Sequence, residues 1–406
     1  MDRTHWQRLN EHIALLDEMD PSRGDAYLKR LAENDPTMAD ELRAFIETDT
    51  DDVSQLAASA RFHDDLSGQN IAGYAIVRRL GAGGMGTVYL AEAVDNPKRQ
   101  VAVKVLSLAA PSPEIRERFD IEQRILGRLN HDHIAQLYEA GRLINGRPYF
   151  VMELVRGLPI TQYCDLNQCS PEERFDLFRQ TCAAVAHAND QGILHRDIKP
   201  SNVLVSRHNG VATVKVIDFG IAKDLNAVQD LTSHPHSPGT QRYMSPEQAG
   251  ALGRDGRPAL QDHRVDVYSL GVLLYELLLG EPPLSWSPGT APLQIYSDIC
   301  FRPAPLPRWI WKGLDEETRE QRAAARGLTP RQWAAHLGEP ITWVAMKALA
   351  KNPATRYASA REAAADVARY QNNQRLNAAA PSLREACGNL MRRHGLAATS
   401  LFLARS

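Results

Sequence analysis

The sequence predicts an α+β protein of two lobes, one rich in antiparallel β-strands and one mainly helical, with a small helical module in front. Two observations predict this order. Runs that alternate apolar and polar residues, such as YAIVRRL, TVYLAEA, QVAVKVL and PYFVMEL, occur between Ile71 and residue 156 and are typical of strands. After Ser170 the apolar residues recur at helical spacing, as in Phe175, Phe178 and Cys182, which indicates helices packed on a core.

Composition and charge narrow the class of protein. The chain has 406 residues, of which 24% are charged and 43% hydrophobic, and its formal net charge is -2. These values are typical of a globular protein of two or three domains, and they give no support to nucleic acid as a partner. Five scattered cysteines form no C-x-x-C pair, which indicates reduced thiols and a cytoplasmic protein.

The first 70 residues predict a separate module and a connection. Within 1–48, Trp6, Leu9, Ile13 and Leu16 have helical spacing, and a second short helix carries Tyr27, Leu28 and Leu31. Asp35 and Pro36 have the residue types of an N-cap and a first helical position. Residues 49–70 are acidic and weakly patterned, so we expect a linker.

Three glycines, Gly81, Gly83 and Gly86, stand in G-x-G-x-x-G order. In a dinucleotide-binding unit a helix follows these glycines, whereas in a phosphate-covering hairpin a strand follows them. The next residues, 87–91, are rich in β-branched and aromatic side chains and therefore predict a strand. No second strand–helix–strand unit follows, so we favour the hairpin over the oxidoreductase alternative.

The β-rich lobe also offers a cation and a partner for it. Lys104 lies in the strand VAVK, where a fixed positive charge would suit nucleotide phosphates. A helix is expected around residues 114–129, and its Glu122 is the best candidate to pair with Lys104. Glu114 and Glu117 are neighbouring alternatives.

The helical lobe begins with SPEE, which predicts a capping box with Ser170 at N-cap, Pro171 at N1 and Glu173 at N3. Beyond this helix, ILHRDIKPSNVLV contains Asp197, Lys199 and Asn202. Asp197 would orient the proton of an attacking hydroxyl. Lys199 would neutralise a transferred phosphoryl group, and Asn202 would hold a metal ion.

A second acidic residue follows a buried strand. Asp218, in VKVIDFGIAK, is followed by Phe219 and Gly220. Carboxylate oxygen is a hard ligand of the kind that Mg²⁺ prefers. Each of these residues alone has an ordinary structural explanation, such as a cap, a turn or a solvated charge. Their order and spacing together indicate phosphoryl transfer.

From Ile71 to Tyr370 these residues resemble the eukaryotic-like (Hanks-type) serine/threonine protein kinases of bacteria. The resemblance implies the bilobal protein kinase fold, with an N-lobe at 71–156 and a C-lobe with insertions at 157–372. It also implies Mg²⁺ (or Mn²⁺), ATP as the phosphoryl donor, and protein substrates bearing serine or threonine. Lys199 two residues after Asp197, together with Thr240 in PGT, is the serine/threonine pattern of that family.

The resemblance also assigns roles to individual residues. Lys104 and Glu122 would form the ion pair of the active state, Met152 would be the gatekeeper, and Asn202 and Asp218 would bind the metal. The residues expected around ATP are Leu80, Gly81, Gly83, Gly86, Val88, Ala102, Lys104, Glu153, Val155 and Leu204. Those expected in structural roles are His195, Arg196, Phe219, Glu247, Asp266 and Arg356, with His195 and Phe219 packing near Leu126 and Leu137.

Regulation through the activation loop is a further expectation. Arg196 precedes Asp197 and would take an anionic partner. The candidate phosphoacceptors are Thr232, Ser233, Ser237 and Thr240, which would be autophosphorylated in a transient homodimer. The alternative is that LTSHPHS is an ordinary polar loop.

The sequence also supports expectations about the two ends of the chain and about one insertion. Kinases of this bacterial group often carry a similar N-terminal module and continue into a membrane helix, and residues 373–406 resemble a juxtamembrane tail. Its apolar run, LAATSLFLA, is less than half of the roughly 20 residues that span a bilayer, so membrane contact is expected only if a C-terminal segment is missing. In the insertion at 300–333, Trp309, Trp311 and Trp333 are either partly exposed partner anchors or core residues.

Two other functions remain open. A pseudokinase would keep the fold and bind partners without catalysis, but such proteins usually lose one of Lys104, Asp197, Asn202 or Asp218, all of which are present here. A small-molecule phosphotransferase would generally lack the GT…SPE segment found at 239–247. We therefore favour an active protein kinase.

Overall fold

The computed structural model describes residues 27, 29–32, 35, 66–83, 86–106, 123, 126–208, 210–219, 240–250, 261–287, 289–338 and 340–379. The chain divides into two compact units, Met1–Leu66 and Ser67–Ser406. In the first unit, the described residues form part of a helix that includes Tyr27 and 29–32, and the Asp35 amide donates to the Leu31 carbonyl at 2.7 Å. The rest of the proposed module and most of the proposed linker lie outside the described residues.

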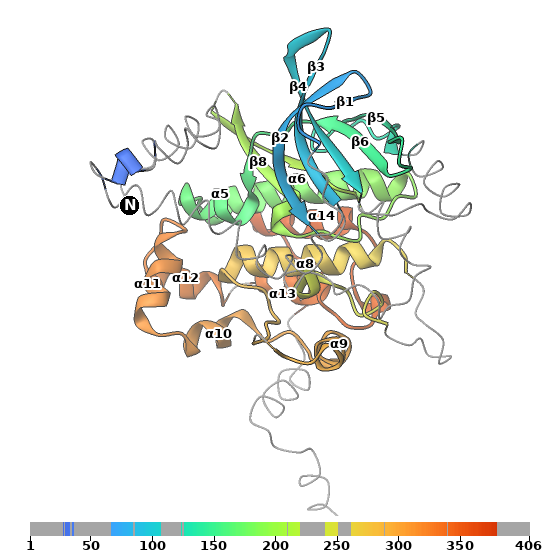
Figure 1. Ribbon diagram of the computed structural model, residues 1–406. Helices are drawn as coiled ribbons and strands as arrows, with labels where there is room; N and C mark the ends of the chain where they lie inside the picture. The colour runs from blue at the N-terminus through green and yellow to red at the C-terminus, as the bar shows by residue number, and fades with distance from the viewer. Residues whose placement is uncertain are drawn as a thin grey trace, which may run out of the picture. The chain divides into compact units, whose positions relative to one another are not determined.

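The second unit begins with a six-stranded antiparallel sheet in the order β1-β2-β3-β4-β6-β5. Figure 1 shows this sheet beside a mainly helical part, which confirms the predicted α+β class. The strands are β1 (Asn70–Ile71), β2 (Tyr74–Gly83), β3 (Gly86–Ala93), β4 (Asn96–Leu106), β5 (Leu137–Arg142) and β6 (Pro148–Glu153). The predicted hairpin is β2–β3, and its turn follows Gly83.

The register of the central strands places a set of side chains on one face. Lys104 lies opposite Val88, and Ala102 lies opposite both Leu90 and Met152. Since directly paired residues share a face of an antiparallel sheet and residues two apart do likewise, Val88, Ala102, Lys104 and Met152 all project to the same side. The residues expected around a nucleotide are therefore grouped by strand geometry.

The C-lobe is built on two long helices, α6 (Pro171–Asp190) and α8 (Arg264–Leu279). Ser170 caps α6 with the predicted capping box: its side chain accepts from the Glu173 amide, and the Glu173 side chain accepts from the Ser170 amide. Nearly every residue of α8 is buried, as expected for a helix that is apolar on all sides. Helix α8 packs against α6, α13 and α14.

The remaining helices surround α6 and α8 in the helical part of Figure 1. Their bounds are α5 (Ile160–Leu166), α9 (Pro292–Phe301), α10 (Pro307–Gly313), α11 (Glu316–Ala324), α12 (Pro330–His336), α13 (Ile341–Ala348) and α14 (Ala360–Gln371). Three short 3₁₀ turns are η2 (Pro200–Asn202), η3 (Thr240–Tyr243) and η4 (Pro353–Thr355).

A small second sheet carries the catalytic segments. Its strands are β7 (Leu158–Pro159), β8 (Val203–His208) and β9 (Val211–Val216), in the order β7-β8-β9. Asn202 immediately precedes β8, and Asp218 follows β9. The loop before β5 joins this sheet through a parallel bridge between Ile134 and Val216, with backbone bonds of 2.8 and 3.0 Å on either side.

The interpretation of the insertion tryptophans as exposed anchors is wrong for two of them. Trp333 is fully buried and Trp311 is 4% exposed, and both belong to the hydrophobic core of the C-lobe. The Arg326 guanidinium stacks over the Trp333 ring at 5.1 Å. Trp309 is half-buried. The insertion thus adds core to the C-lobe, because its short helices turn their tryptophans inward.

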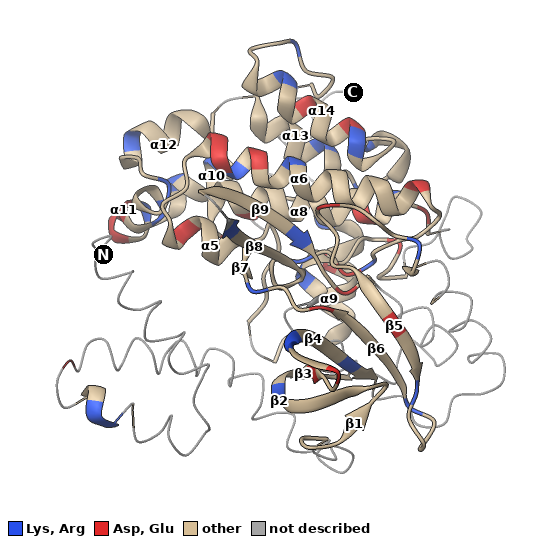
Figure 2. Ribbon diagram, turned by 90° about the horizontal axis from the view of Figure 1, so that it is seen from above, with Lys and Arg blue, Asp and Glu red and all other residues tan. Residues whose placement is uncertain are grey.

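Charged residues of both signs are interspersed over the helices seen in Figure 2. Within the part of the chain that the structure describes, none of the helices has the length and apolar character needed to cross a membrane.

Candidate active site

The site lies where the two sheets meet, and its clearest feature is an ion pair between them. The Lys104 ammonium, from β4, is 2.8 Å from Oδ1 of Asp218, which follows β9. The Lys104 side chain is 14% exposed and that of Asp218 is 25% exposed, so both are partly buried and still reach solvent. The carboxylate expected to bind metal and the lysine expected near phosphate are thus neighbours. Glu122, the expected partner of Lys104, lies outside the described residues.

Asp197 is the centre of a second cluster, on the loop before β8. Lys199 Nζ lies 3.3 Å from Oδ2 of Asp197, and the Asn202 amide nitrogen donates to the Asp197 carbonyl at 2.8 Å and to Oδ2 at 3.0 Å. The Asp197 side chain is 9% exposed. The Ile217 amide donates to the Asn202 carbonyl at 3.0 Å, which fixes this loop against the segment that carries Asp218.

The loop takes its shape from Asp266 in the first turn of α8. This fully buried carboxylate accepts from the backbone amides of His195 and Arg196, both at 2.8 Å, and from the Asn189 side chain at 2.9 Å. Because Asp266 binds the amides of both His195 and Arg196, the chain bends here and Arg196 has a left-handed backbone, with φ 61°. Such conformations are costly and persist only where the surroundings impose them.

His195 links the loop to the core. Its Nδ1 accepts from the Asp197 amide at 3.2 Å, so its Nε2 carries the proton and donates to the Ile217 carbonyl at 3.0 Å. Complete burial lowers the pKa of His195, which keeps the ring neutral. The ring centroid lies 4.6 Å from that of Phe219, and Phe219 belongs to the core that contains Leu126 and packs against Leu137.

Asp218 has a left-handed backbone as well, with φ 59°. This conformation turns the chain sharply after β9, so that the carboxylate contacts Lys104 while the next side chain, Phe219, is buried against His195. The two left-handed residues of the site are therefore Arg196, which directly precedes Asp197, and Asp218 itself.

The donor set fits a hard divalent ion. Because the Asn202 nitrogen makes both of its bonds to Asp197, the amide oxygen is directed away from that residue. One carboxylate and one amide oxygen are hard ligands, and Mg²⁺ is commonly held by so few protein groups together with substrate phosphates and water. No group of three or more His, Cys, Asp or Glu side chains suited to a metal occurs among the described residues, and this arrangement requires none.

The three glycines of the hairpin serve different purposes. A Cβ on Gly86, at φ 153°, would overlap the backbone oxygen of Val105, so the close approach of β3 to β4 requires this glycine. A Cβ on Gly81 or Gly83 would meet no described atom within 4 Å, and both residues are exposed. Packing against described atoms therefore does not explain why these two positions are glycine.

The other residues expected around ATP are less closely defined. Ala102 is buried, Val88, Val155 and Leu204 are half-buried, and Leu80 is 37% exposed. The Glu153 amide donates to the Gln136 carbonyl at 2.8 Å, which leaves only its carbonyl oxygen for a nucleotide.

The structure adds two positioning residues that sequence reasoning missed. Lys215 Nζ lies 2.9 Å from Glu153 Oε2, and the Gln248 side chain donates to the Arg196 carbonyl at 2.8 Å. The position of Gln248 directly after Glu247 was the one feature of the sequence that could have indicated a role for it. Its contact with Arg196 joins residues 52 positions apart, so no pattern of neighbouring residues predicts it.

The end of the predicted activation segment is anchored by a buried ion pair. The Arg356 guanidinium donates to both oxygens of Glu247, at 2.7 and 2.8 Å, and also to three backbone carbonyls. Thr240 begins η3. Thr232, Ser233 and Ser237 lie outside the described residues.

A family model for the protein kinase domain matches residues 74–365. The chain belongs to the protein kinase family.

Similar proteins and structures agree with this assignment. The chain is 35% identical over 298 residues to serine/threonine-protein kinase Pkn1 of Myxococcus xanthus, which covers 73% of this chain and 38% of that protein. It is 35% identical over 301 residues to serine/threonine-protein kinase PknB of Mycobacterium leprae, with 73% and 42% covered. The chain therefore aligns with about two fifths of each of these kinases. The crystal structure of the Mycobacterium tuberculosis PknI kinase domain matches with a TM-score of 0.52 and 28% identity, covering 76% of this chain and 98% of that one.

Proposed function

We propose that this protein is a serine/threonine protein kinase that transfers the γ-phosphoryl group of Mg-ATP to hydroxyls of proteins in bacterial signalling. One observation carries the proposal: the Lys104–Asp218 pair, at 2.8 Å, lies beside the Asp197–Lys199–Asn202 cluster. A cation, a metal-binding carboxylate and a base for a hydroxyl are the groups that phosphoryl transfer needs in one place.

The residues would divide the work as follows. Asp197 holds and orients the substrate hydroxyl and accepts its proton, since its carboxylate is already fixed by Lys199 and Asn202. Lys199 and Lys104 face the phosphate oxygens, where negative charge is redistributed in the transition state. Asp218 and Asn202 hold Mg²⁺, which when bound neutralises the phosphates. Gly81 and Gly83 let backbone amides approach those phosphates.

Support for serine and threonine as acceptors comes from Lys199, placed two residues after Asp197, and from Thr240. The names of the bacterial relatives, serine/threonine-protein kinases Pkn1 and PknB, agree with it. ATP is abundant in the cytoplasm, so we place the reaction there.

We also propose that the kinase phosphorylates its own activation loop in a transient homodimer, at Thr232, Ser233, Ser237 or Thr240. Arg196, next to the catalytic aspartate, would receive the phosphate.

The test is phosphoryl transfer from γ-labelled ATP with Mg²⁺, using the full chain and mapping modified residues by mass spectrometry. Asp197→Asn and Asp218→Asn should abolish incorporation. Asp95→Asn, at an exposed site in the β3–β4 turn, is the matched control and should leave it unchanged. If the unmodified chain binds ATP but incorporates no phosphate, with or without a generic protein substrate, the proposal fails and the pseudokinase alternative is favoured.

A further inference from the structure

Two cysteines meet at the end of α5, outside the active site. The helix closes with a pair of backbone bonds: the Cys169 amide donates to the Cys164 carbonyl at 2.8 Å, and the Gln168 amide donates to the Asp165 carbonyl at 3.2 Å. Gln168 has a left-handed backbone, φ 48°. This pattern is a Schellman motif, which characteristically brings the side chains at the positions of Cys164 and Cys169 into contact.

The motif therefore places the two thiols beside each other, and the Cys164 thiol lowers the pKa of Cys169 while Cys169 raises that of Cys164. Around Cys169, Arg174 and Arg207 favour the thiolate, whereas Glu173 and burial oppose it. Cys164 is fully buried and Cys169 is 5% exposed. A second thiol beside Cys169 is the resolving partner that disulfide formation requires, and Cys169 is the one of the two with some exposure to solvent.

The other described cysteines lack this arrangement. Cys182 is fully buried, and burial raises the pKa of its thiol. Cys300 is half-buried, its thiol faces the Pro246 carbonyl at 3.8 Å, and burial raises its pKa as well. These two residues therefore serve as internal controls for oxidation.

We propose that Cys164 and Cys169 form a redox pair that peroxides oxidise reversibly to an intramolecular disulfide. The Cys169 thiolate attacks a peroxide oxygen, breaking the O–O bond and giving a sulfenic acid. The Cys164 sulfur then attacks the sulfenic sulfur, and water leaves as the S–S bond forms. In sum, two thiols and one hydrogen peroxide give one disulfide and two waters, and the two electrons pass from the sulfurs to the peroxide. A dithiol reductant reverses the step.

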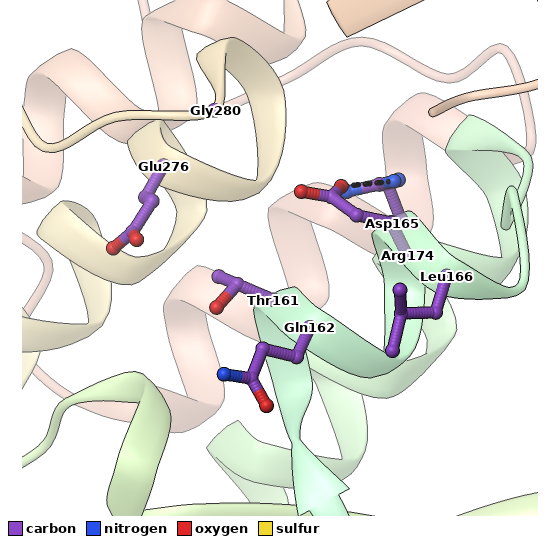
Figure 3. Close-up of a pocket in the computed structure, with 7 residues that line it drawn as sticks. All are labelled: Thr161, Gln162, Asp165, Leu166, Arg174, Glu276 and Gly280. Carbon is purple, nitrogen blue, oxygen red and sulfur yellow. Dashed lines mark hydrogen bonds and ion pairs between the residues drawn. The ribbon is translucent and has the colours of Figure 1, made fainter. Parts of the chain in front are cut away.

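The disulfide would alter a hollow between α5, α6 and α8. Figure 3 shows this hollow, of about 270 Å³, with the Asp165–Arg174 ion pair on one side and Glu276 on another. Arg174 is held there by the Cys169 carbonyl at 3.1 Å and by Asp165 at 2.7 Å. Formation of the S–S bond would draw the two side chains together and shift the Cys169 backbone, whose carbonyl supports Arg174.

The experiment treats the folded full chain with hydrogen peroxide and digests it with trypsin after blocking free thiols. Both cysteines lie in the fragment 157–174, so a disulfide appears as the loss of two hydrogens from that fragment and of two titratable thiols. Dithiothreitol should restore both. Cys164→Ser and Cys169→Ser should each abolish the two-hydrogen loss, while Cys182→Ser should leave it unchanged.

Three outcomes would overturn the proposal: oxidation of Cys300 before the pair, sulfinic acid on Cys169 with Cys164 still reduced, or a disulfide that appears only in denaturant. Because a serine at a buried position can unfold the chain, Cys164→Ala serves as a second variant, checked by circular dichroism. In folded C164A, Cys169 should be over-oxidised to sulfinic acid, since no second thiol is available to trap the sulfenic acid. An unmodified Cys169 in that variant would also contradict the proposal.

Discussion

Lys104 lies in the large sheet and Asp218 follows the last strand of the small one, yet their side chains form a direct ion pair at the candidate site. Lys104 is positioned by the pairing of β4 with β3 and β6, and Asp218 by the left-handed turn after β9. Neither residue is needed to fill the core. Their joint position is the one that the proposed transfer from Mg-ATP requires.

Replacing Lys104 by methionine tests this explanation. We expect the rate of phosphoryl transfer to fall by about 10²–10³, the usual effect of removing one preorganised charge from a transition state, while the chain stays folded. Lys98→Met, on an exposed part of the same strand, is the control and should keep full activity. Initial rates at saturating ATP provide the measurement, and an equal loss in both variants would contradict the assignment.

Arg356 presents a different kind of charged residue. It is buried with Glu247, and among the described residues its hydrogen bonds go to Glu247 and to backbone carbonyls outside the active-site cluster. The pair ties the segment after η3 to the chain that precedes α14. Arg356→Met should lower the free energy of unfolding by about 3–5 kcal/mol, because a buried carboxylate would be left without its partner.

The exposed Arg361–Asp190 pair, at 71% and 56% exposure, offers the control. Arg361→Met should cost no more than about 1 kcal/mol, as exposed pairs contribute little. Urea unfolding of both variants makes the comparison. Equal effects would mean that the Glu247–Arg356 pair does not stabilise this part of the C-lobe.

Helix α6 is capped at its start by Ser170 and carries near its end Asn189, whose side chain donates to both Asp266 and the Ile193 carbonyl. Ser170→Ala removes the side chain that accepts from the Glu173 amide and should destabilise the protein by about 1 kcal/mol. Ser170→Asp retains an acceptor and should be close to neutral. Urea midpoints decide the matter, and a similar loss in both variants would exclude capping as the cause.

Local sequence patterns predicted best those elements whose stabilising contacts are made by residues close in the sequence. The SPEE capping box, the β2–β3 hairpin and the helical character after Ser170 could all be inferred from neighbouring residues. Trp311 and Trp333 could not be placed, since their burial depends on how α10 and α12 pack on the rest of the C-lobe. Lys215 and Gln248 were missed for the same reason: each contact joins residues more than 50 positions apart.

At the scale of the whole kinase unit, His131 and His195 contribute to the pH dependence of stability. His131 lies with its ring centroid 5.5 Å from that of His133 and 5.0 Å from that of His187. Burial, followed by His133 and His187, lowers the pKa of His131 below its ordinary value of 6.5; Asp132 opposes this shift and Lys215 adds to it. Burial lowers the pKa of His195 in the same direction.

Between each lowered pKa and 6.5, the unfolded chain binds more protons than the folded one. The histidine contribution to stability therefore rises with pH through this window, whereas Glu276, whose pKa burial raises to about 7, makes a contribution of opposite sign. Urea midpoints of wild type and His131→Gln are therefore compared at about pH 5.5 and about pH 7.5, and the substitution should raise the midpoint at the lower pH relative to that at the higher pH. An identical pH dependence in wild type and variant would show that His131 makes no contribution.

The bridge between Ile134 and Val216 has a consequence for movement of the lobes. It fastens the chain entering β5 to the strand that ends just before Asp218, and Lys215 adds a side-chain tie to β6. The β5–β6 edge of the large sheet is thus held to the C-lobe, while the β2–β3 hairpin lies on the other side of β4. We therefore expect any movement between the lobes to displace the β2–β3 hairpin more than the β5–β6 edge, so that the proposed nucleotide would enter and leave at the glycine-rich side.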